Sequence, residues 1–150
     1  MSHPKIPIFE YNYIVDGIFI GTNQCCQTHF DEILIKKGVA ADISVEKEKI
    51  DMPYGVDFFC WIPVKDGRAP TMKQLTYGVA ALEKCVQLKE KVYIHCQNGH
   101  GRAPTFVAAY LIKSKKLTPH EAYIFIKNRR KSIHLRRAQL TILKKFAKQF

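Results

Sequence analysis

The chain has 150 residues, of which 47% are hydrophobic and 11% aromatic, and this composition excludes an intrinsically disordered protein. We expect one domain over residues 1–150. No apolar run is long enough to span a bilayer, and the first residues lack the apolar core of a secretion signal, so we expect a cytoplasmic protein, with a nuclear location also open.

The excess of positive charge is confined to the last quarter of the sequence. Residues 1–112 contain 12 Lys/Arg and 12 Asp/Glu, whereas residues 113–150 contain 12 Lys/Arg and one acid, which gives the net charge of +11. One interpretation is a solvated helical face. The other is a surface for an anionic partner such as a phosphoprotein, a phosphoinositide head group or RNA.

The first third of the chain predicts a hairpin, a helix and a strand. Residues 13–15 and 18–20 flank an Asp-Gly turn, which is typical of a β-hairpin. Apolar residues at helical spacing predict one helix over residues 24–37, ended by Gly38. Residues 39–45 then form a predicted buried strand.

The remaining chain alternates strands with helices. The sequence Thr71-x-x-Gln74 is a capping box, and Thr118-Pro119-His120-Glu121 adds a proline at the first helical position. This part predicts strands at 57–62 and 92–95, and helices from residue 71, over 102–115, 118–128 and 136–148. The alternation predicts an α/β fold with a central, mostly parallel sheet flanked by helices, in which the C-terminal helices cover one face.

Residues 92–105 carry the strongest functional signal. A strand leads through a glycine-bearing turn into a helix, and the turn begins with Cys96 and ends with Arg102. Backbone N–H groups and the helix N-terminus would form a cradle for a tetrahedral oxyanion such as phosphate. The same field would hold Cys96 as a thiolate, the nucleophilic form of cysteine. Ligands in such sheets bind at the carboxyl ends of the strands, where Cys96 falls.

The other residues of this loop have predicted roles around the phosphate. Arg102 would bind two phosphoryl oxygens with its planar guanidinium group. His95 and Thr105 are expected behind the loop rather than against the substrate. The predicted substrate-binding residues are Gln97, Asn98, Gly99, His100, Gly101, Arg102 and Ala103.

A thiolate that displaces an alkoxide or phenoxide needs a general acid. Asp66 lies in a polar loop after a predicted strand, 30 residues before Cys96, and is the best candidate. The chain has five cysteines, Cys25, Cys26, Cys60, Cys85 and Cys96, whose spacings match no zinc pattern. We expect them to be reduced and expect no metal site.

The sequence VYIHCQNGHGRAPT resembles the H-C-x5-R signature of cysteine-dependent phosphatases. The wider pattern is similar to the small atypical dual-specificity phosphatases. It comprises IFIGT near the N-terminus, Asp66 after a strand, and the stretch Arg130-Lys131-Ser132-Ile133. The resemblance implies phosphomonoester hydrolysis through a phosphocysteine, with Cys96 as nucleophile and Asp66 as acid and then base, and no metal or organic cofactor. It implies phosphotyrosine, phosphoserine or phosphothreonine proteins as substrates. Phosphoinositides and RNA 5′-phosphates stay open, as does the oligomeric state.

The chain departs from the family pattern at one position. The family usually has Ser or Thr after the arginine, where this chain has Ala103. That hydroxyl is thought to help the thiolate leave the phosphoenzyme, so its loss favours a rival hypothesis, a phosphate-recognition module without turnover. Thr105 is the candidate for replacing the hydroxyl.

Overall fold

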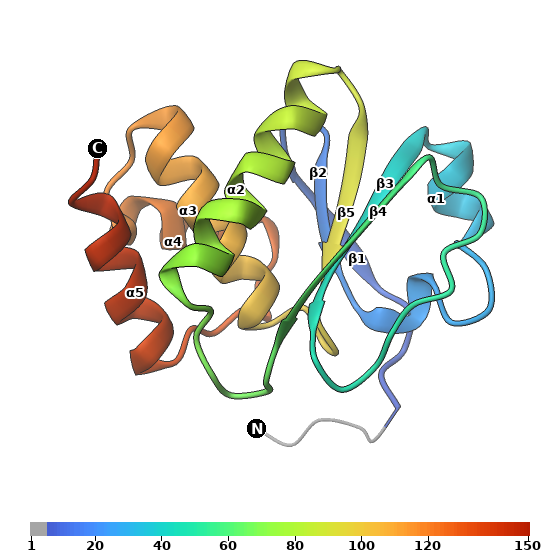
Figure 1. The fold of residues 1–150 in the computed structure, drawn as a ribbon, viewed down its shortest axis with the longest axis horizontal. Helices are drawn as coiled ribbons and strands as arrows, with labels where there is room; N and C mark the ends of the chain where they lie inside the picture. Colours follow the sequence, from blue (N-terminus) through green and yellow to red (C-terminus); the bar gives the residue numbers. More distant parts are fainter. Residues whose placement is uncertain (1–5) are drawn as a thin grey trace.

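The computed structural model describes residues 6–150, and its centre is a five-stranded sheet (Figure 1). The spatial order is β1-β2-β5-β3-β4. The pair β1–β2 is antiparallel, and the other pairs are parallel. The predicted α/β fold with a mostly parallel sheet is therefore confirmed. The strands are β1 (Tyr11–Val15), β2 (Ile18–Gly21), β3 (Val39–Glu46), β4 (Phe58–Val64) and β5 (Lys91–His95).

The helices cover the sheet unequally. Four of them, α2 to α5, lie together on one face, while α1 and a short 3-10 helix, η1, lie on the other (Figure 1). The C-terminal helices thus cover one face, as predicted, and α2 joins them. The helices are η1 (Asn23–Cys25), α1 (Glu32–Lys36), α2 (Met72–Gln87), α3 (Arg102–Lys115), α4 (Pro119–Arg129) and α5 (Arg137–Ala147).

Both predicted capping boxes are present. The Thr71 hydroxyl accepts from the backbone N–H of Gln74, and the Gln74 side chain accepts from the N–H of Thr71. Thr118 and Glu121 make the same reciprocal pair, with Pro119 in the first turn. These bonds satisfy N–H groups that have no partner within the helix, and they fix where α2 and α4 begin.

The prediction of one helix over residues 24–37 is wrong. The chain forms η1, then bends, and starts a new helix at Glu32, where the Asp31 carboxylate caps the N–H groups of Ile33 and Leu34. The backbone N–H of Phe30 donates to the carbonyl of Tyr54 instead of continuing a helix. The contact of Phe30 with the loop after β3 therefore prevents a continuous helix, although the apolar residues have helical spacing.

The prediction that all five cysteines are reduced is also wrong for one pair. Cys25 and Cys26 form a disulfide between adjacent residues, and both are buried. Sequence spacing gives no indication of such a bond, because adjacent cysteines are brought together by the turn at the end of η1. Cys60, Cys85 and Cys96 are free thiols.

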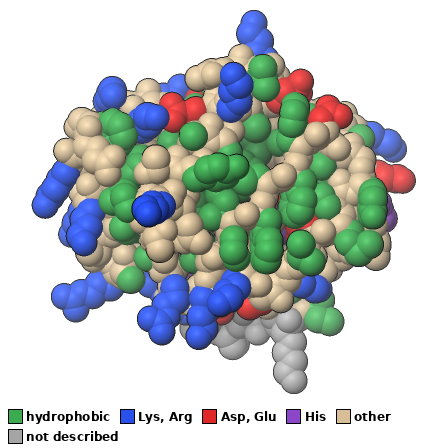
Figure 2. All heavy atoms as spheres, viewed as in Figure 1, with side chains coloured by type: hydrophobic (Ala, Val, Ile, Leu, Met, Phe, Trp, Pro, Cys, Tyr) green, Lys and Arg blue, Asp and Glu red, His purple; other side chains and the backbone are tan. Residues whose placement is uncertain are grey.

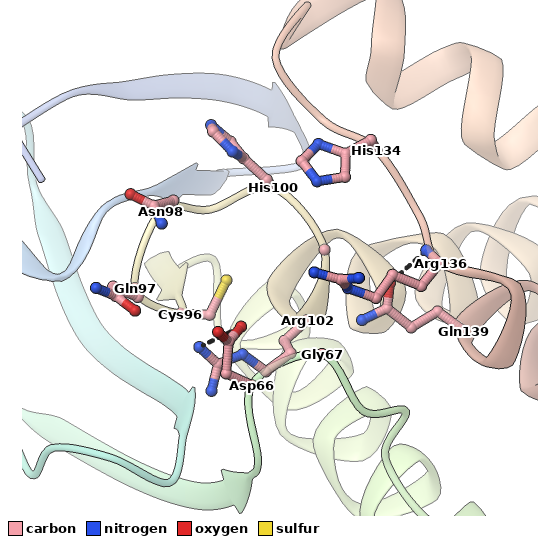
Figure 3. Close-up of a pocket in the computed structure, with 11 residues that line it drawn as sticks. Asp66, Gly67, Cys96, Gln97, Asn98, His100, Arg102, His134, Arg136 and Gln139 are labelled. Atoms are coloured by element: carbon pink, nitrogen blue, oxygen red, sulfur yellow. Dashed lines mark hydrogen bonds and ion pairs between the residues drawn. The ribbon is translucent and has the colours of Figure 1, made fainter. Parts of the chain in front are cut away.

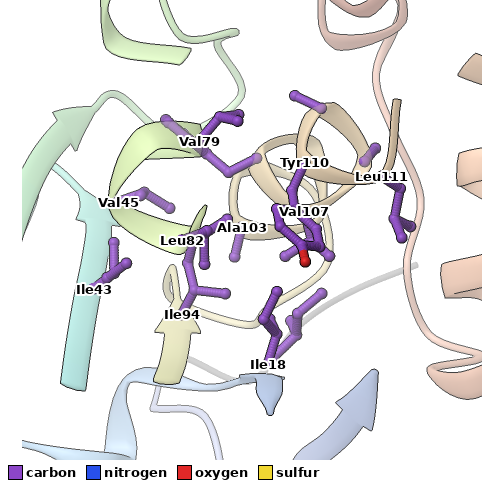
Figure 4. Close-up of a cluster of buried hydrophobic side chains, with 14 of the residues drawn as sticks. Ile18, Ile43, Val45, Val79, Leu82, Ile94, Ala103, Val107, Tyr110 and Leu111 are labelled. Atoms are coloured by element: carbon purple, nitrogen blue, oxygen red, sulfur yellow. The ribbon is translucent and has the colours of Figure 1, made fainter. Parts of the chain in front are cut away.

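The strand β5 sends its side chains alternately to two cores. Ile94 lies in the larger core with Leu82 of α2 and Val107 of α3 (Figure 4), and Val92 belongs to the same core. Tyr93 lies in a smaller core with Phe30. Since β5 pairs with β2 and β3, its backbone is held on both sides. The end of β5 is therefore a rigid point from which a loop can leave.

Lys and Arg side chains gather along the edge of the molecule that α5 occupies in Figure 1, in keeping with the basic last quarter of the sequence (Figure 2). Over residues 6–150, every helix is too short or too polar to cross a bilayer.

A side-chain hydrogen bond connects the turn between β1 and β2 with α3. The Tyr110 hydroxyl donates to Asp16 Oδ2 at 2.6 Å, and Lys115 Nζ lies 2.9 Å from the same oxygen. The hydrogen bond from Tyr110, with the charge of Lys115, holds the pKa of Asp16 below its usual value.

We expect Tyr110→Phe to lower the free energy of unfolding by about 1 kcal/mol at pH 7. Because the folded-state pKa of Asp16 is lowered, this stabilisation is present above the unfolded pKa of about 3.9 and is lost as the pH falls through the folded value. Urea unfolding should show that Tyr110→Phe lowers the free energy of unfolding by less at pH 3 than at pH 7. Tyr77→Phe, at an exposed position on α2, is the matched control and should change stability little. An equal loss for Tyr110→Phe at both pH values would contradict the assignment.

Candidate active site

A polar pocket lies at the carboxyl end of β5, between the loop that follows it and the start of α5 (Figure 3). Cys96 directly follows β5, and Arg102 is the first residue of α3, so the loop spans 96–101. The pocket is lined by Asp66, Gly67, Cys96, Gln97, Asn98, His100, Gly101, Arg102, His134, Arg136 and Gln139. Two further segments, 66–67 and 134–139, thus meet the loop that carries the predicted nucleophile.

Arg102 is buried and held in one orientation. Its side chain is 3% exposed. Nη1 donates to the carbonyl of Val64 at 2.7 Å and to Glu48 Oε1 at 2.5 Å. Burial acts to lower the pKa of Arg102, but nearby anionic groups, Cys96 foremost, outweigh it and raise the pKa. The guanidinium is therefore a permanent, pre-oriented cation beside the Cys96 sulfur.

Asp66 is brought to the same pocket by the loop after β4. Its carboxylate is 68% exposed, and Oδ1 lies 3.5 Å from Arg102 Nη2. The Cys96 sulfur, the Asp66 carboxylate and the Arg102 guanidinium lie close together (Figure 3). An acid at the open side of the pocket is where a leaving oxygen would need a proton.

Glu48 was missed by sequence reasoning, because it lies in a polar connection without a motif. Its Oε1 accepts from Arg102, and its Oε2 accepts from the backbone N–H of Asp66 at 3.0 Å. Partial burial acts to raise the pKa of Glu48, but these two hydrogen bonds prevail and lower it. One carboxylate thereby links the arginine to the loop that carries the acid.

Arg130 holds the loop from behind. The side chain is 2% exposed, and it donates to the carbonyls of Gly99 and Asn98 at 2.9 and 2.8 Å. It also donates to Asn12 Oδ1 and pairs with Glu10. Arg130 falls in the basic segment 113–150, for which the sequence left a surface for an anionic partner open, but its charge is used inside the fold and not at the surface.

Gly99 is required by this arrangement. Its φ is +69°, and a Cβ would lie 2.6 Å from the carbonyl oxygen of Gly21 and 2.8 Å from the Arg130 guanidinium. Contrary to the prediction, Gly99 does not line the pocket, because the tight turn directs it toward β2. It shapes the loop instead.

His95 lies behind the loop, as predicted. Nδ1 is 3.2 Å from the carbonyl oxygen of Cys96, and Nε2 is 2.7 Å from Asp51 Oδ2 and 3.2 Å from Asp42 Oδ1. Burial acts to lower the pKa of His95, but the two carboxylates raise it well above its usual value. Burial also raises the pKa of Asp42, to about 8.

The mouth of the pocket contains a second arginine. The centres of the His100 and His134 rings are 5.4 Å apart. The backbone N–H of His134 donates to the backbone carbonyl of His100. Gln139 accepts from the N–H of Arg136 at 2.9 Å and donates to the carbonyl of Arg68. His100 was a predicted pocket residue, whereas Arg136 was expected only as part of the basic surface.

Ala103 and Thr105 do not supply the hydroxyl that the family pattern contains. Ala103 is fully buried in the larger core and, contrary to the prediction, is not among the residues that line the pocket. The Thr105 hydroxyl donates to the carbonyl of Gly101 at 2.7 Å. Its proton is therefore used within α3.

We expect Arg130→Lys to lower the free energy of unfolding by about 1–3 kcal/mol, because one ammonium cannot satisfy carbonyls and side chains on several sides. The affinity for inorganic phosphate should fall as well, since the loop loses its support. Denaturant unfolding and isothermal titration calorimetry measure the two effects. Arg137→Lys, at an exposed position on α5, is the control. Unchanged stability and phosphate binding in Arg130→Lys would show that the loop does not depend on it.

The comparisons with known proteins agree with this geometry. The dual specificity phosphatase catalytic domain matches residues 18–149. The chain is 45% identical over 80 residues to human phosphatidylglycerophosphatase and protein-tyrosine phosphatase 1, a match that covers 53% of this chain and 40% of that protein. It is 36% identical over 74 residues to human dual specificity protein phosphatase 5, covering 49% of this chain and 19% of that protein.

A solved structure extends the likeness over the fold. The crystal structure of PTPMT1 in complex with PI(5)P matches with a TM-score of 0.78 and 27% identity, over 93% of this chain and 95% of that one. The chain thus spans less than half of the length of the curated relatives above. With the domain match over residues 18–149 and the loop from Cys96 to Arg102 at the end of β5, the chain belongs to the dual-specificity phosphatase family.

Proposed function

We propose that this chain hydrolyses phosphomonoesters through a phosphocysteine on Cys96. The observation that carries the proposal is the meeting of Cys96 and Arg102, from the segment after β5, with Asp66, from the loop after β4, in one pocket. A pocket that only recognised phosphate would not need an acid at its open side. The rival hypothesis of a non-catalytic module therefore has less support.

The reaction follows from the positions of these groups. The Cys96 thiolate attacks phosphorus, Arg102 binds the equatorial oxygens, and Asp66 gives its proton to the leaving oxygen. In the second step a water molecule loses a proton to the Asp66 carboxylate and attacks phosphorus. The S–P bond breaks, and inorganic phosphate and the Cys96 thiolate are released.

For the substrate, we propose the phosphomonoester of an anionic lipid head group. Among residues 6–150, the residues lining the pocket include no aromatic ring other than the imidazoles of His100 and His134, so a flat phenyl ring would lack an apolar partner. Arg136 offers a second cation beside Arg102, which suits a head group with a further phosphate. The lipid substrate named for the human relative points in the same direction.

A phosphoprotein is the second candidate, favoured by the likeness to dual specificity protein phosphatase 5. An RNA 5′-phosphate is less favoured than the sequence suggested, because Arg130 is buried and is not part of a surface for nucleic acid.

A substrate panel tests the proposal. Wild type should release phosphate from phosphatidylglycerophosphate in mixed micelles with a higher kcat/KM than from phosphotyrosine or phosphothreonine peptides, and Cys96→Ser should be at background on all of them. Arg136→Ala should raise KM for the lipid and leave a small aryl phosphate unaffected; Arg137→Ala is the control. A higher kcat/KM for the peptides than for the lipid would refute the lipid assignment but not the mechanism. Activity retained in Cys96→Ser would refute the mechanism.

Ala103 predicts slow breakdown of the phosphoenzyme. With an aryl phosphate, wild type should show a burst of about one phenol per chain and then a slower steady rate. Ala103→Ser should raise the steady rate without enlarging the burst, because residue 103 lies in the same buried cluster as Cys96 and a hydroxyl there can donate to the departing thiolate from the core side. Rapid-quench kinetics measures both phases. Linear progress curves that are the same in both proteins would contradict this assignment.

A further inference from the structure

Behind the loop, on the face of the sheet opposite α3, five potential metal ligands converge. Cys25, Cys26, Asp42, Asp51 and His95 each offer one ligand atom, all five residues are buried, and these atoms lie within 4.8 Å of one another. They come from η1, β3, the loop after β3, and β5. The chemistry of Cys96 uses none of these atoms directly.

The alternation of the strands explains why such polar groups meet. In β3, Ala41, Ile43 and Val45 face the larger core, so Asp42 faces the opposite side together with His95 of β5. A polar residue at this position would normally be solvated. Here η1 and the loop around Asp51 cover the face, and Asp42 is fully buried.

The cluster has acceptors without enough donors. Neither carboxylate oxygen of Asp42, nor Oδ1 of Asp51, has a hydrogen bond of good geometry within residues 6–150. Their neighbour, the Nε2 of His95, lies 3.2 Å from Asp42 and 3.4 Å from the Cys26 sulfur. Buried carboxyl groups without enough hydrogen-bond donors are costly, and they are normally compensated by a bound proton or by a cation.

The orientation of His95 is that of a metal ligand. Nδ1 is within hydrogen-bond distance of the Cys96 carbonyl oxygen, which accepts only from an N–H. The other nitrogen, Nε2, carries an N–H and points into the cluster, where it lies 2.7 Å from Asp51 Oδ2 and 3.2 Å from Asp42 Oδ1. When that proton leaves, the lone pair of Nε2 points at the same place. A backbone carbonyl that fixes the ring in this way is typical around metal-bound histidine.

We propose that the reduced cluster binds one zinc ion through Cys25, Cys26, His95 and Asp42. Two thiolates, an imidazole and a carboxylate are a donor set that zinc prefers and that calcium and magnesium do not. Tetrahedral zinc with its usual bond lengths separates its ligand atoms by roughly 3.3–3.8 Å, so the present spread closes with small shifts once the two sulfurs are parted. Asp51 stays beside the site as a further anionic group.

The disulfide and the metal site are alternative states of the same two cysteines. Two electrons and two protons from a thiol reductant break the Cys25–Cys26 bond, and the reductant leaves as its own disulfide. Zinc then displaces the two thiol protons and the proton on His95 Nε2. A small-molecule disulfide that takes two electrons from the two thiolates restores the Cys25–Cys26 bond and is itself reduced to two thiols, which removes two ligands and releases the ion. The redox state of this pair therefore controls what supports His95, the residue before the nucleophile.

The first measurement is the metal content of the full chain, purified with a thiol reductant in zinc-containing buffer and then dialysed. We expect about one zinc per chain by mass spectrometry. The paired change Cys25→Ser and Cys26→Ser should abolish it, and Asp42→Asn should weaken it. The pair Cys60→Ser and Cys85→Ser is the matched control and should keep the ion. Cys96→Ser should also keep it, which separates this site from zinc on the nucleophile.

A second measurement does not depend on the variants folding. Cobalt(II) added to reduced wild type should give a thiolate-to-metal charge-transfer band and the visible bands of a tetrahedral ion, and a disulfide-forming oxidant should remove both. Several results would overturn the proposal: less than about a tenth of an ion per chain, no charge-transfer band, or an ion that is lost in Cys96→Ser. In those cases a proton on His95 is the cation that compensates the carboxylates.

Discussion

The position of β5 in the middle of the sheet is the constraint on which the site depends. Parallel neighbours on both sides fix its backbone up to His95, so the next residue leaves from a point that cannot shift. The alternation of side chains along β5 then gives Cys96 to the face covered by α3 and His95 to the opposite face. The loop between them and Arg102 can form an anion cradle because its start and its end are both anchored in regular structure.

Two buried or half-buried ion networks complete the site from outside the loop. Glu48 connects Arg102 with the backbone of Asp66, so the proposed phosphate-binding cation and the proposed general acid share one carboxylate. Arg130 binds the loop carbonyls from the other side. Neither residue is expected to touch the reacting phosphorus, yet both determine where the groups that do touch it are placed.

The sequence indicated the fold and the centre of the site because these rest on local patterns. Strand and helix periodicity, two capping boxes and the spacing from Cys96 to Arg102 are all readable without tertiary contacts. Glu48, Arg130 and Arg136 act through contacts between segments far apart in the chain, and no spacing rule marks them. The helix expected over residues 24–37 failed for the same reason, since the contact of Phe30 with Tyr54 is not local. Nothing in the sequence indicated that Asp42 belongs to a buried polar cluster, because Asp42 lies in a strand whose other residues are mostly apolar.

The hydrogen bonds of Arg130 have a consequence for how the protein folds during synthesis. Asn12 and Glu10 are 118 and 120 residues away from Arg130 in the sequence, and the loop carbonyls are about 30 residues away. The phosphate cradle therefore acquires its final shape only after the ribosome has made α4 and the following residue, although Cys96 and Arg102 are made much earlier. Closing such a long loop is slow and entropically unfavourable, so the stretch from Cys96 to Arg102 stays without its final shape at least until residue 130 has been made.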